Sequence, residues 1–269
     1  MSGHDYLLGH SNREHERLQA QADLFAPFTE DLFRRAGLAS GMNVLDIGAG
    51  AGDVSIMAAQ FVGTSGSVLA IDRAPESVAH ANERVRRLGL DNVRFMQGDL
   101  TAVQLDRQFD AMVGRLIVLY LPDRERVLQR LLQFVRPGGV VALQEMDMTM
   151  GKTEPDIALF REARDVIVET TRRAGFEPDM GTRLPPLLRR LGLQPSALMG
   201  ARVESGPDSP AYNYMAQTIR SVLPLSEKLG VTTAAKIEVD TLAERLKNEL
   251  TSHDAVFVLP PLTSVWARR

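Results

Sequence analysis

The chain has 269 residues, of which 44% are hydrophobic and 24% are charged, and its 31 basic and 34 acidic residues give a formal net charge of −3. This is the composition of an ordinary soluble globular protein, without the overall positive field expected of a nucleic-acid-binding protein. The absence of cysteine excludes disulfides, thiolate metal sites and a cysteine nucleophile.

Two further exclusions concern membranes and metal hydrolysis. No apolar stretch approaches the roughly 18 uncharged residues that a membrane-spanning helix needs. The first residues also lack the basic and apolar regions of a signal peptide. We therefore expect a cytoplasmic protein that does not bind a membrane. The five histidines form no zinc-binding HExxH pair, so metal-dependent hydrolysis is not expected.

The first predicted element is helical and covers residues 11–36, where Pro27 predicts a break into two N-terminal helices. Residues 44–145 then alternate short apolar runs with helical stretches, which is typical of a parallel sheet covered on both faces. The predicted strands are residues 44–48, 68–72, 93–97, 109–113 and 140–145, and the helices between them are residues 54–61, 75–88 and 123–135. The Pro-Gly-Gly run at 137–139 predicts a break immediately before the fifth strand.

The pattern is weaker in the last 120 or so residues, where the apolar runs are shorter and loops are more frequent. Here the predicted helices are residues 156–174, 185–191, 211–223 and 233–250, and the predicted strands are residues 201–204, 255–259 and 263–267. A length well above the roughly 100–150 residues of a typical domain allows either two small domains or one large one.

The sharpest local signal is a glycine-rich turn at residues 44–54, where a buried strand runs into Gly48, Gly50 and Gly52 and then into a helix. Glycines at alternate positions let the chain turn tightly and let a ligand approach the backbone without meeting a Cβ. The helix that follows would point its first N–H groups at that ligand. The turn favours a nucleotide-type ligand, although purely structural turns also use glycine.

Two aspartates refine this interpretation. Asp46 lies in the strand end before the glycines, where a carboxylate would repel a pyrophosphate and suits a cationic or N–H-bearing ligand. Asp72 ends the second strand, twenty residues after Gly52, and could accept hydrogen bonds from both ribose hydroxyls of an adenosine. The alternative for Asp72 is a cap on the helix that begins at Pro75.

Five motifs follow one another in a fixed order. They are DIGAGAG at 46–52, AID at 70–72, GDL at 98–100, FDAMVGRLIVLYLPD at 109–123 and RPGGVVALQE at 136–145. In this order and spacing they resemble the class I S-adenosylmethionine-dependent methyltransferases, closely over about residues 40–146. The remaining segments are similar, more loosely, to bacterial small-molecule methyltransferases of the ubiquinone/menaquinone-biosynthesis-like group.

The resemblance implies an α/β fold with a Rossmann-like, doubly wound, seven-stranded sheet. The sheet would be mostly parallel with the last strand antiparallel, and it would carry N-terminal helices and a helical lid. We expect a single domain in three parts: a helical cap at residues 1–40, a cofactor-binding core at 41–147, and the rest of the sheet with lid insertions at 148–269.

S-adenosylmethionine is the cofactor that the resemblance implies, with S-adenosylhomocysteine as product. Its methionine moiety would lie against Gly48, Gly50 and Gly52, with Asp46 near the amino group. For the adenosine, Asp72 would hold the ribose, Arg73 would border the adenine, Asp99 would accept the adenine amino group, and Leu100 would offer its backbone N–H.

Further residues would border the methyl-transfer site or close over the cofactor. Gly114 and Arg115 follow the fourth strand and would border the methionine end, although a salt bridge is nearly as good an explanation for Arg115. Tyr6, Arg17 and Gln21 are candidates for closing over the cofactor, with a surface helix as the alternative.

The sequence also departs from two related patterns. Residues 114–120 lack the Asn/Asp-Pro-Pro-Tyr/Phe signature of enzymes that methylate amide or base nitrogens, which argues against methylation of DNA or glutamine. Glu145 and Asp147 leave a Mg²⁺ ion open as an option, but the metal pattern of catechol methyltransferases is not evident. We therefore expect no metal.

Methyl transfer from a sulfonium mainly requires nucleophile, carbon and sulfur to be held in line in a dry pocket. A general base is needed only for an acceptor that is protonated at neutral pH. The candidate bases are His10, His15, Tyr120 and Glu145, and for each of them a solvated or capping role is the alternative.

The acceptor pocket is expected from the segments added to the core. Its candidate lining residues are Met148, Tyr212, Tyr214 and Met215, which would suit a small, partly apolar acceptor or simply fill a core. The leading hypothesis is methyl transfer to an oxygen, nitrogen or carbon atom of such a molecule. The alternatives are a cofactor-binding module or cyclase-like enzyme without methyl transfer, and an RNA methyltransferase using the arginines at 84, 86, 87 and 94. A homodimer is left open.

Overall fold

The computed structural model describes residues 12–269, with the side chains of residues 21, 22 and 24–269. It divides into two compact units. The core-sheet unit consists of Phe25–Glu145, Gly181–Met199 and Thr263–Arg269; the small-sheet unit consists of Met146–Met180 and Gly200–Leu262 with the chain up to Leu24. The expected limits of a cap at residue 40 and a core at residue 147 stay a prediction.

A seven-stranded sheet forms the centre of the core-sheet unit, in the order β3-β2-β1-β4-β5-β10-β7. Its strands are β1 (Asn43–Ile47), β2 (Ser67–Asp72), β3 (Val93–Gln97), β4 (Phe109–Arg115), β5 (Val135–Met146), β7 (Ser196–Gly200) and β10 (Leu262–Arg268). The first five, β1 to β5, are parallel to one another. Arg269, after β10, exchanges backbone hydrogen bonds with Gly138 and Gly139 near the start of β5, so β10 is antiparallel to β5. The sheet implied by the resemblance is confirmed.

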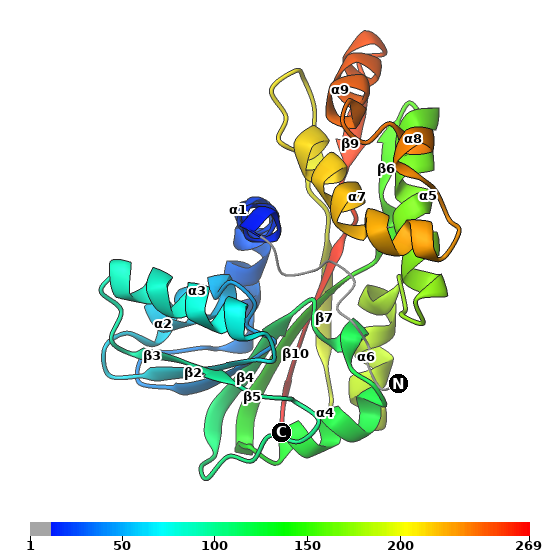
Figure 1. The fold of residues 1–269 in the computed structure, drawn as a ribbon. Helices are drawn as coiled ribbons and strands as arrows, with labels where there is room; N and C mark the ends of the chain where they lie inside the picture. The colour runs from blue at the N-terminus through cyan, green and yellow to red at the C-terminus, as the bar shows by residue number, and fades with distance from the viewer. Residues whose placement is uncertain (1–11) are drawn as a thin grey trace. The chain divides into compact units, whose positions relative to one another are not determined.

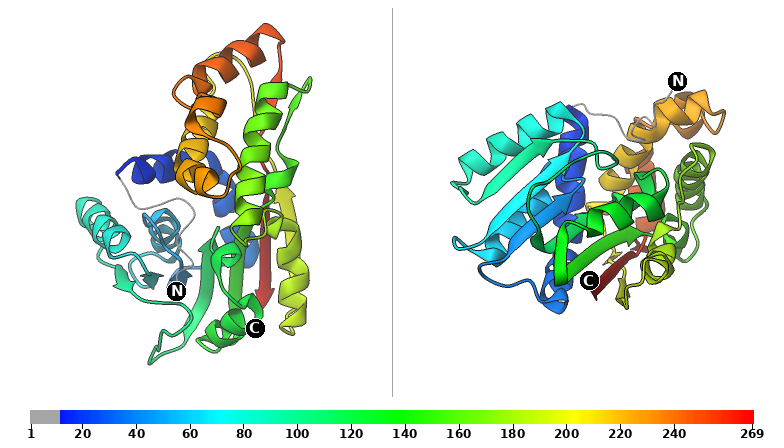
Figure 2. Two further views of the ribbon diagram at one scale, coloured as in Figure 1. Left: turned by 45° about the vertical axis from the view of Figure 1, so that its right-hand side comes forward. Right: turned by 90° about the horizontal axis from the view of Figure 1, so that it is seen from below.

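Helices cover both faces of this sheet (Figure 1). They include α2 (Asp53–Val62), α3 (Pro75–Arg87), η1 (Val118–Tyr120), α4 (Arg124–Leu132) and α6 (Met180–Arg190). Figure 2 shows α2 and α3 on one face and α4 on the other. Pro75 stands in the first turn of α3, where its missing N–H costs nothing, and the Asp123 side chain accepts the N–H of Arg126 to cap α4. The apolar strands are thereby buried from both sides.

The Pro-Gly-Gly run was expected before the fifth strand, but it lies within it. Phe109 pairs with Val135 and Ala111 with Val140, so residues 136–139 form a bulge on β5. A Cβ on Gly139 would lie 2.7 Å from the Val135 side chain and 2.9 Å from the Arg136 carbonyl oxygen. Glycine is therefore needed at position 139 to keep the bulge packed. The strand continues through a Pro-Gly-Gly sequence that normally ends a strand.

The N-terminal segment is also different from the prediction, because α1 (Asn12–Ala36) is one helix with Pro27 inside it. Phe25, Leu32 and Phe33 lie on either side of the proline and are each 1% exposed. Burial of these side chains on both sides of residue 27 offsets the hydrogen bond that the proline cannot make. The prediction that Pro27 divides this segment into two helices was therefore wrong.

The small-sheet unit contains a second sheet, in the order β6-β9-β8, with both pairs antiparallel. Its elements are η2 (Met148–Met150), β6 (Lys152–Glu154), α5 (Ala158–Arg173), β8 (Val203–Glu204), α7 (Ala211–Lys228), α8 (Ala234–Ile237), α9 (Leu242–Ser252) and β9 (Val256–Val258). On β9, Phe257 packs edge to face on Phe160 of α5, with ring centroids 4.6 Å apart.

This second sheet corrects three sequence predictions. The strands expected at 201–204 and 255–259 pair with each other, the second of them also pairs with β6, and neither belongs to the seven-stranded sheet. The sixth strand of that sheet, β7, was missed. The helix expected at 233–250 is two helices, because Glu238 adopts a left-handed conformation with φ 49° and ends α8.

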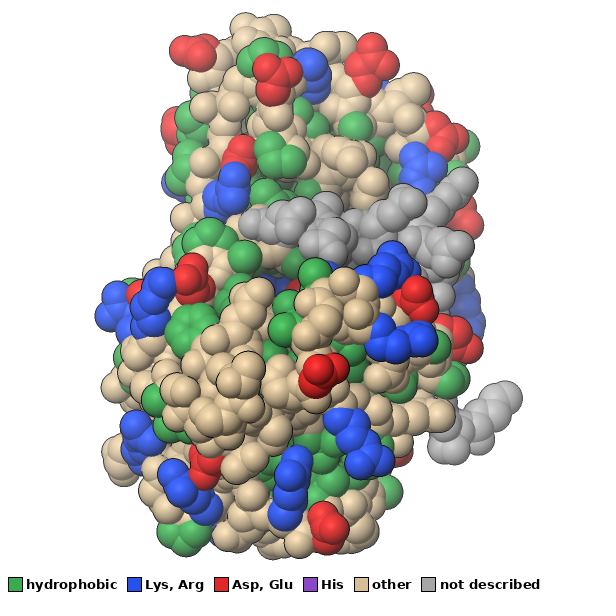
Figure 3. Space-filling view, turned by 90° about the vertical axis from the view of Figure 1, so that its left-hand side faces the viewer, with side chains coloured by type: hydrophobic (Ala, Val, Ile, Leu, Met, Phe, Trp, Pro, Cys, Tyr) green, Lys and Arg blue, Asp and Glu red, His purple; other side chains and the backbone are tan. Residues whose placement is uncertain are grey.

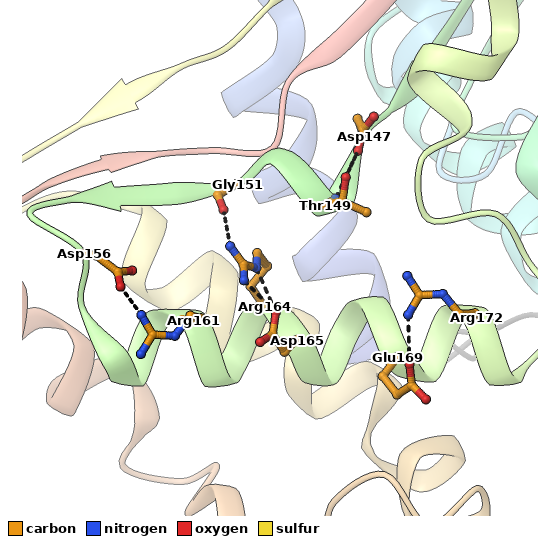
Figure 4. A network of polar contacts seen from close by, with 9 residues as sticks. All are labelled: Asp147, Thr149, Gly151, Asp156, Arg161, Arg164, Asp165, Glu169 and Arg172. Carbon is orange, nitrogen blue, oxygen red and sulfur yellow. Dashed lines mark hydrogen bonds and ion pairs between the residues drawn. The ribbon is translucent and has the colours of Figure 1, made fainter.

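Polar contacts fasten α5 to the segment before it, as Figure 4 shows. Arg164 of α5 donates to the carbonyl oxygen of Gly151 at 3.2 Å, and the side chain of Asp147 accepts from the backbone N–H of Thr149. Arg164 also pairs with Asp165 on the exposed face of the helix, an arrangement that contributes little to stability.

None of the helices in the described part of the chain combines the length and the hydrophobicity that a membrane span requires.

Candidate functional site

The three glycines of the turn between β1 and α2 all have positive φ, but their surroundings differ. A Cβ on Gly48 would lie 2.4 Å from the Ile117 side chain, and one on Gly52 would lie 2.8 Å from Phe95. A Cβ on Gly50 would meet nothing within 4 Å. Gly48 and Gly52 are therefore needed for packing, whereas Gly50 leaves open space above the turn.

Asp72 fastens this turn to the end of β2. One carboxylate oxygen accepts the N–H of Gly50 at 2.8 Å, and the other accepts the N–H of Ala74 at 2.9 Å, just before α3. The capping role that was the alternative for Asp72 is thus present. It coexists with a position at the carboxyl edge of the parallel strands, and a carboxylate still has lone pairs for further donors.

Asp46, at the end of β1, is the most unusual group of the turn. It is 1% exposed, and one of its oxygens accepts from the Ser55 hydroxyl on α2. Burial raises the pKa of this carboxyl to about 7, although the hydrogen bond from Ser55 and the charge of Arg115 act in the opposite direction. Its Oδ1 has no hydrogen-bond partner among the described residues.

A buried oxygen without a partner costs free energy, and it is satisfied when a ligand supplies a donor. The turn therefore combines an unpaired acceptor in Asp46, open space at Gly50 and a second carboxylate in Asp72. These features fit a ligand with a cationic or N–H-bearing end and a hydroxyl-bearing sugar, as S-adenosylmethionine has.

Arg115, at the end of β4, lies on the same face of the sheet as Asp46. Val113 is the β4 partner of Asp46, and side chains two residues apart on a strand share a face. Its Nη1 donates to the hydroxyl of Thr29 on α1 at 3.0 Å. The Thr29 hydroxyl donates to Gln144 Oε1 at 2.7 Å, and Gln144 Nε2 donates to Ser264 on β10 at 2.7 Å.

Glu145 follows Gln144 and is a second buried carboxyl, with 0% exposure. Its Oε1 accepts the N–H groups of Ile117 at 2.9 Å and Val118 at 2.6 Å, which fixes the loop whose Ile117 side chain lies against Gly48. Burial raises the pKa of Glu145 to about 8 in spite of these hydrogen bonds. Its Oε2 has no partner among the residues with described side chains.

The remaining core candidates are also at the carboxyl ends of strands. Arg73 follows β2 and is exposed; Asp99 and Leu100 follow β3, with Asp99 accepting the N–H and hydroxyl of Thr101 at 2.8 Å. Gly114 packs on β1, since a Cβ there would lie 2.8 Å from the Ile47 side chain. Tyr120 is half-buried in η1. The parallel sheet thus brings the predicted core residues to one edge.

The other candidates belong to the second unit or are not described. Met148 lies in η2, where the Thr171 hydroxyl contacts its sulfur at 3.7 Å. Tyr214 and Met215 are buried in α7, and Tyr212 donates to the carbonyl oxygen of Gly206 at 2.9 Å. Gln21 is buried in α1. Tyr6 and His10 lie outside the described residues, as do the side chains of His15 and Arg17.

The arginines considered for RNA binding are largely paired. Arg84 pairs with Asp53, and Arg86 and Arg87 both pair with Glu83. Figure 3 shows positive and negative side chains interspersed over the face that carries α2 and α3. On the side of the molecule that this view draws, the described side chains form a mixture of charges and not the single-sign groove that a nucleic-acid backbone requires. Among the described residues, no three carboxylates or histidines gather as metal ligands would.

Four residues of this region were missed by the sequence interpretation: Ser55, Thr29, Gln144 and Ser264. Gln144 offered a signal, because it is the first polar residue after the apolar run at 140–143 in a strand that is otherwise buried. Thr29 and Ser264 offered none, since Gln144, the partner that they share, is more than 100 residues away from each along the chain.

Comparison with known proteins identifies a family and individual proteins to which this chain is similar. The family described as "Methyltransferase domain" matches residues 38–173. An arsenite methyltransferase of Halobacterium salinarum is 34% identical over 115 residues, which make up 42% of this chain and 29% of the relative. The match therefore spans less than a third of that relative's length.

Solved structures share the fold at low sequence identity. The YcgJ protein of Bacillus subtilis has a TM-score of 0.58 and 13% identity, with 90% of this chain and 98% of that chain covered. The [4+2]-cyclase SpnF has a TM-score of 0.54 and 18% identity, with 90% and 80% covered. At these identities the likeness concerns the fold alone, which serves more than one reaction.

The buried carboxyl of Glu145 predicts a pH dependence of stability. Its pKa is about 8 in the folded protein, against an ordinary value of 4.5 for a glutamate, so the folded state binds the proton more tightly. The free energy of unfolding should therefore fall as pH rises from about 5 to about 9, by a few kcal/mol at most. Glu145→Gln keeps an oxygen for Ile117 and Val118 and should flatten this decline in urea titrations.

The matched control is Glu169→Gln, which changes an exposed carboxylate whose pKa is lowered by Arg173 and Arg172. It should leave the decline unchanged. Equal pH slopes in the wild type and in Glu145→Gln would contradict the assignment of the decline to this group.

Proposed function

The chain belongs to the family of class I S-adenosylmethionine-dependent methyltransferases, and on this basis we propose that it methylates an oxygen, nitrogen or carbon atom of a small, partly apolar molecule. The observation that carries the proposal is the turn at residues 46–52, where Oδ1 of Asp46, without a partner among the described residues, lies in the strand end that leads to Gly50 and its open space. A cytoplasmic location and a homodimer stay predictions.

We assign the cofactor to the residues that the parallel sheet gathers at its carboxyl edge. Gly50 would admit the methionine end, and Asp46 would accept from its amino group. Asp72 would hold the ribose hydroxyls with the lone pairs that Gly50 and Ala74 leave unused. Asp99 and Leu100 would hold the adenine, and Arg73 would border it. When bound, S-adenosylmethionine supplies a methyl group that is already activated by the positive sulfur.

Among the candidate bases with described side chains, Glu145 has the most suitable surroundings for moving a proton. Its Oε1 is fixed by two backbone N–H groups, so its Oε2 has a defined direction and no partner among the described residues. A pKa near 8 allows the group to exchange a proton with an acceptor hydroxyl near neutral pH. We therefore propose that the ionised form of Glu145, whose share grows as the pH approaches 8, accepts the proton if the substrate is protic, with Tyr120 as the alternative.

The second candidate function is cofactor binding without methyl transfer, as in a cyclase-like enzyme. The structural likeness to a [4+2]-cyclase keeps this alternative in view. Product mass separates the two: a methyltransferase adds one methyl group to the acceptor and produces one S-adenosylhomocysteine per turnover. We expect both products when the protein is incubated with S-adenosylmethionine and a metabolite extract, followed by mass spectrometry. A product formed without either change would favour the cyclase-like alternative.

Gly50→Ala tests the location of the cofactor. The added methyl group would enter the open space above the turn, so the variant should fold, at a cost of about 1–2 kcal/mol for its left-handed backbone. S-adenosylhomocysteine should raise the melting temperature of the wild type, because the ligand binds only the folded state. We expect this shift to be lost in Gly50→Ala.

The control is Gly89→Ala, after α3, where φ is also positive and a Cβ would also meet nothing within 4 Å. It should carry the same backbone cost and keep the full ligand-dependent shift. No shift in the wild type at millimolar ligand would refute cofactor binding, and an unchanged shift in Gly50→Ala would refute this placement of the site.

A further inference from the structure

A row of buried polar side chains crosses the core-sheet unit beneath α1. Thr29, Gln144 and Ser264 are all buried, on α1, β5 and β10, and Arg115 of β4 joins them at one end. Their neighbours in the core include Phe25, Leu32 and Phe33. Burial of polar groups among apolar ones is costly unless each group is paired, so such a row calls for an explanation.

The hydrogen bonds of this row have one consistent direction. A guanidinium can only donate, so the Thr29 oxygen must accept from Arg115. The single hydrogen of the Thr29 hydroxyl then goes to Gln144 Oε1, 2.7 Å away, in preference to the Phe25 carbonyl oxygen at 3.4 Å. The amide nitrogen of Gln144 is left to donate to Ser264. Because the Thr29 hydroxyl donates to Gln144, the direction of its O–H bond is fixed. The lone pair of the same oxygen is thereby oriented to accept from the Arg115 guanidinium.

Arg115 is also the cation that acts on Asp46. Among the residues with described side chains, the charged groups that act on Asp46 are Arg115 from β4, Asp72 from the end of β2 and Asp53 from α2, and Asp53 is itself paired with Arg84 of α3. Arg115 favours the ionised carboxylate, whereas the two aspartates and burial favour the protonated form. Small changes in the position of Arg115 therefore alter the charge of Asp46 near neutral pH.

We propose that Thr29 is a positioning residue: its hydroxyl, oriented by Gln144 and Ser264, holds the Arg115 guanidinium where it favours the ionised form of Asp46, the form that receives the cationic end of the cofactor. This inference rests on the proposed function. It assigns to α1 an electrostatic role in cofactor affinity that is separate from covering the site.

The test compares Thr29→Val, which removes the hydroxyl, with Thr29→Ser, which retains it. Thr263→Val is the matched control, because Thr263 is also buried in this unit and its hydroxyl has no partner among the described residues. The affinity for S-adenosylhomocysteine is measured by calorimetry from about pH 6 to about pH 9. We expect Thr29→Val to bind roughly fivefold more weakly near pH 7, the loss of ionised Asp46 that a rise of about one pKa unit gives there, and to approach the wild type at high pH.

Thr29→Ser and Thr263→Val should keep the wild-type profile. An equal loss of affinity at every pH in Thr29→Val, or no loss, would overturn the proposal, because a purely structural role would not change the pH dependence. If Thr29→Val does not fold, Thr29→Ala gives the same comparison without the bulk of the valine.

A second measurement needs no cofactor and so separates this proposal from the proposed function. If the wild type does not bind S-adenosylhomocysteine at any pH, the proposed function fails, and the pH dependence of urea unfolding decides the role of Thr29. The loss of stability with rising pH should extend to higher pH in Thr29→Val than in the wild type. This difference should vanish when both chains also carry Asp46→Asn, and its persistence would overturn the proposal.

Discussion

Keeping a carboxyl group buried at the end of β1 is the constraint on which the rest of the site depends. Asp46 is 1% exposed, and desolvation alone would keep it protonated at neutral pH. The surrounding elements counter this with one hydrogen bond from Ser55 and one positive charge from Arg115. The result is a pKa of about 7, so the group can respond to a ligand at physiological pH.

At the same edge of the sheet, hydrogen bonds and side-chain packing hold the backbone of the loop after β4 in place. Leu116 has φ 55°, an uncommon conformation for a side chain that is not glycine, and its N–H donates to the Gln144 carbonyl oxygen at 2.9 Å. Glu145 then accepts from the next two N–H groups, and Ile117 packs where Gly48 has no Cβ. The end of β5 thus supports the loop after β4, which in turn supports the glycine turn after β1.

Much of the core-sheet unit is predictable from sequence because its information is local. The first four strands are short segments rich in apolar residues, two of them are followed directly by Gly48 and Gly98, and parallel strands bring their carboxyl ends to one edge. Asp46 and Asp72 could be selected from position alone. The bulge at 136–139 and the continuous α1 could not, because tertiary packing outweighs the local preferences of proline and glycine there.

The missed features depend on partners that are distant in the chain. β7 has the sequence SALMG and is exposed along most of its length, so it has no apolar alternation to detect. β6 contains Lys152 and Glu154 and is a strand only because β9 pairs with it. The Thr29–Gln144–Ser264 row has the same origin: each residue is ordinary in its own segment, and its role exists only after folding.

The central claim is that Asp46 receives the cationic end of S-adenosylmethionine, and proton release on binding tests it most directly. Calorimetric titration of S-adenosylhomocysteine near pH 7, in buffers with different ionisation enthalpies, gives the number of protons exchanged. Because a bound cation favours the ionised carboxylate, binding should release about half a proton from a group with a pKa near 7, and Asp46→Asn should abolish the release. Binding without proton release, or the same release in Asp46→Asn, would contradict the account.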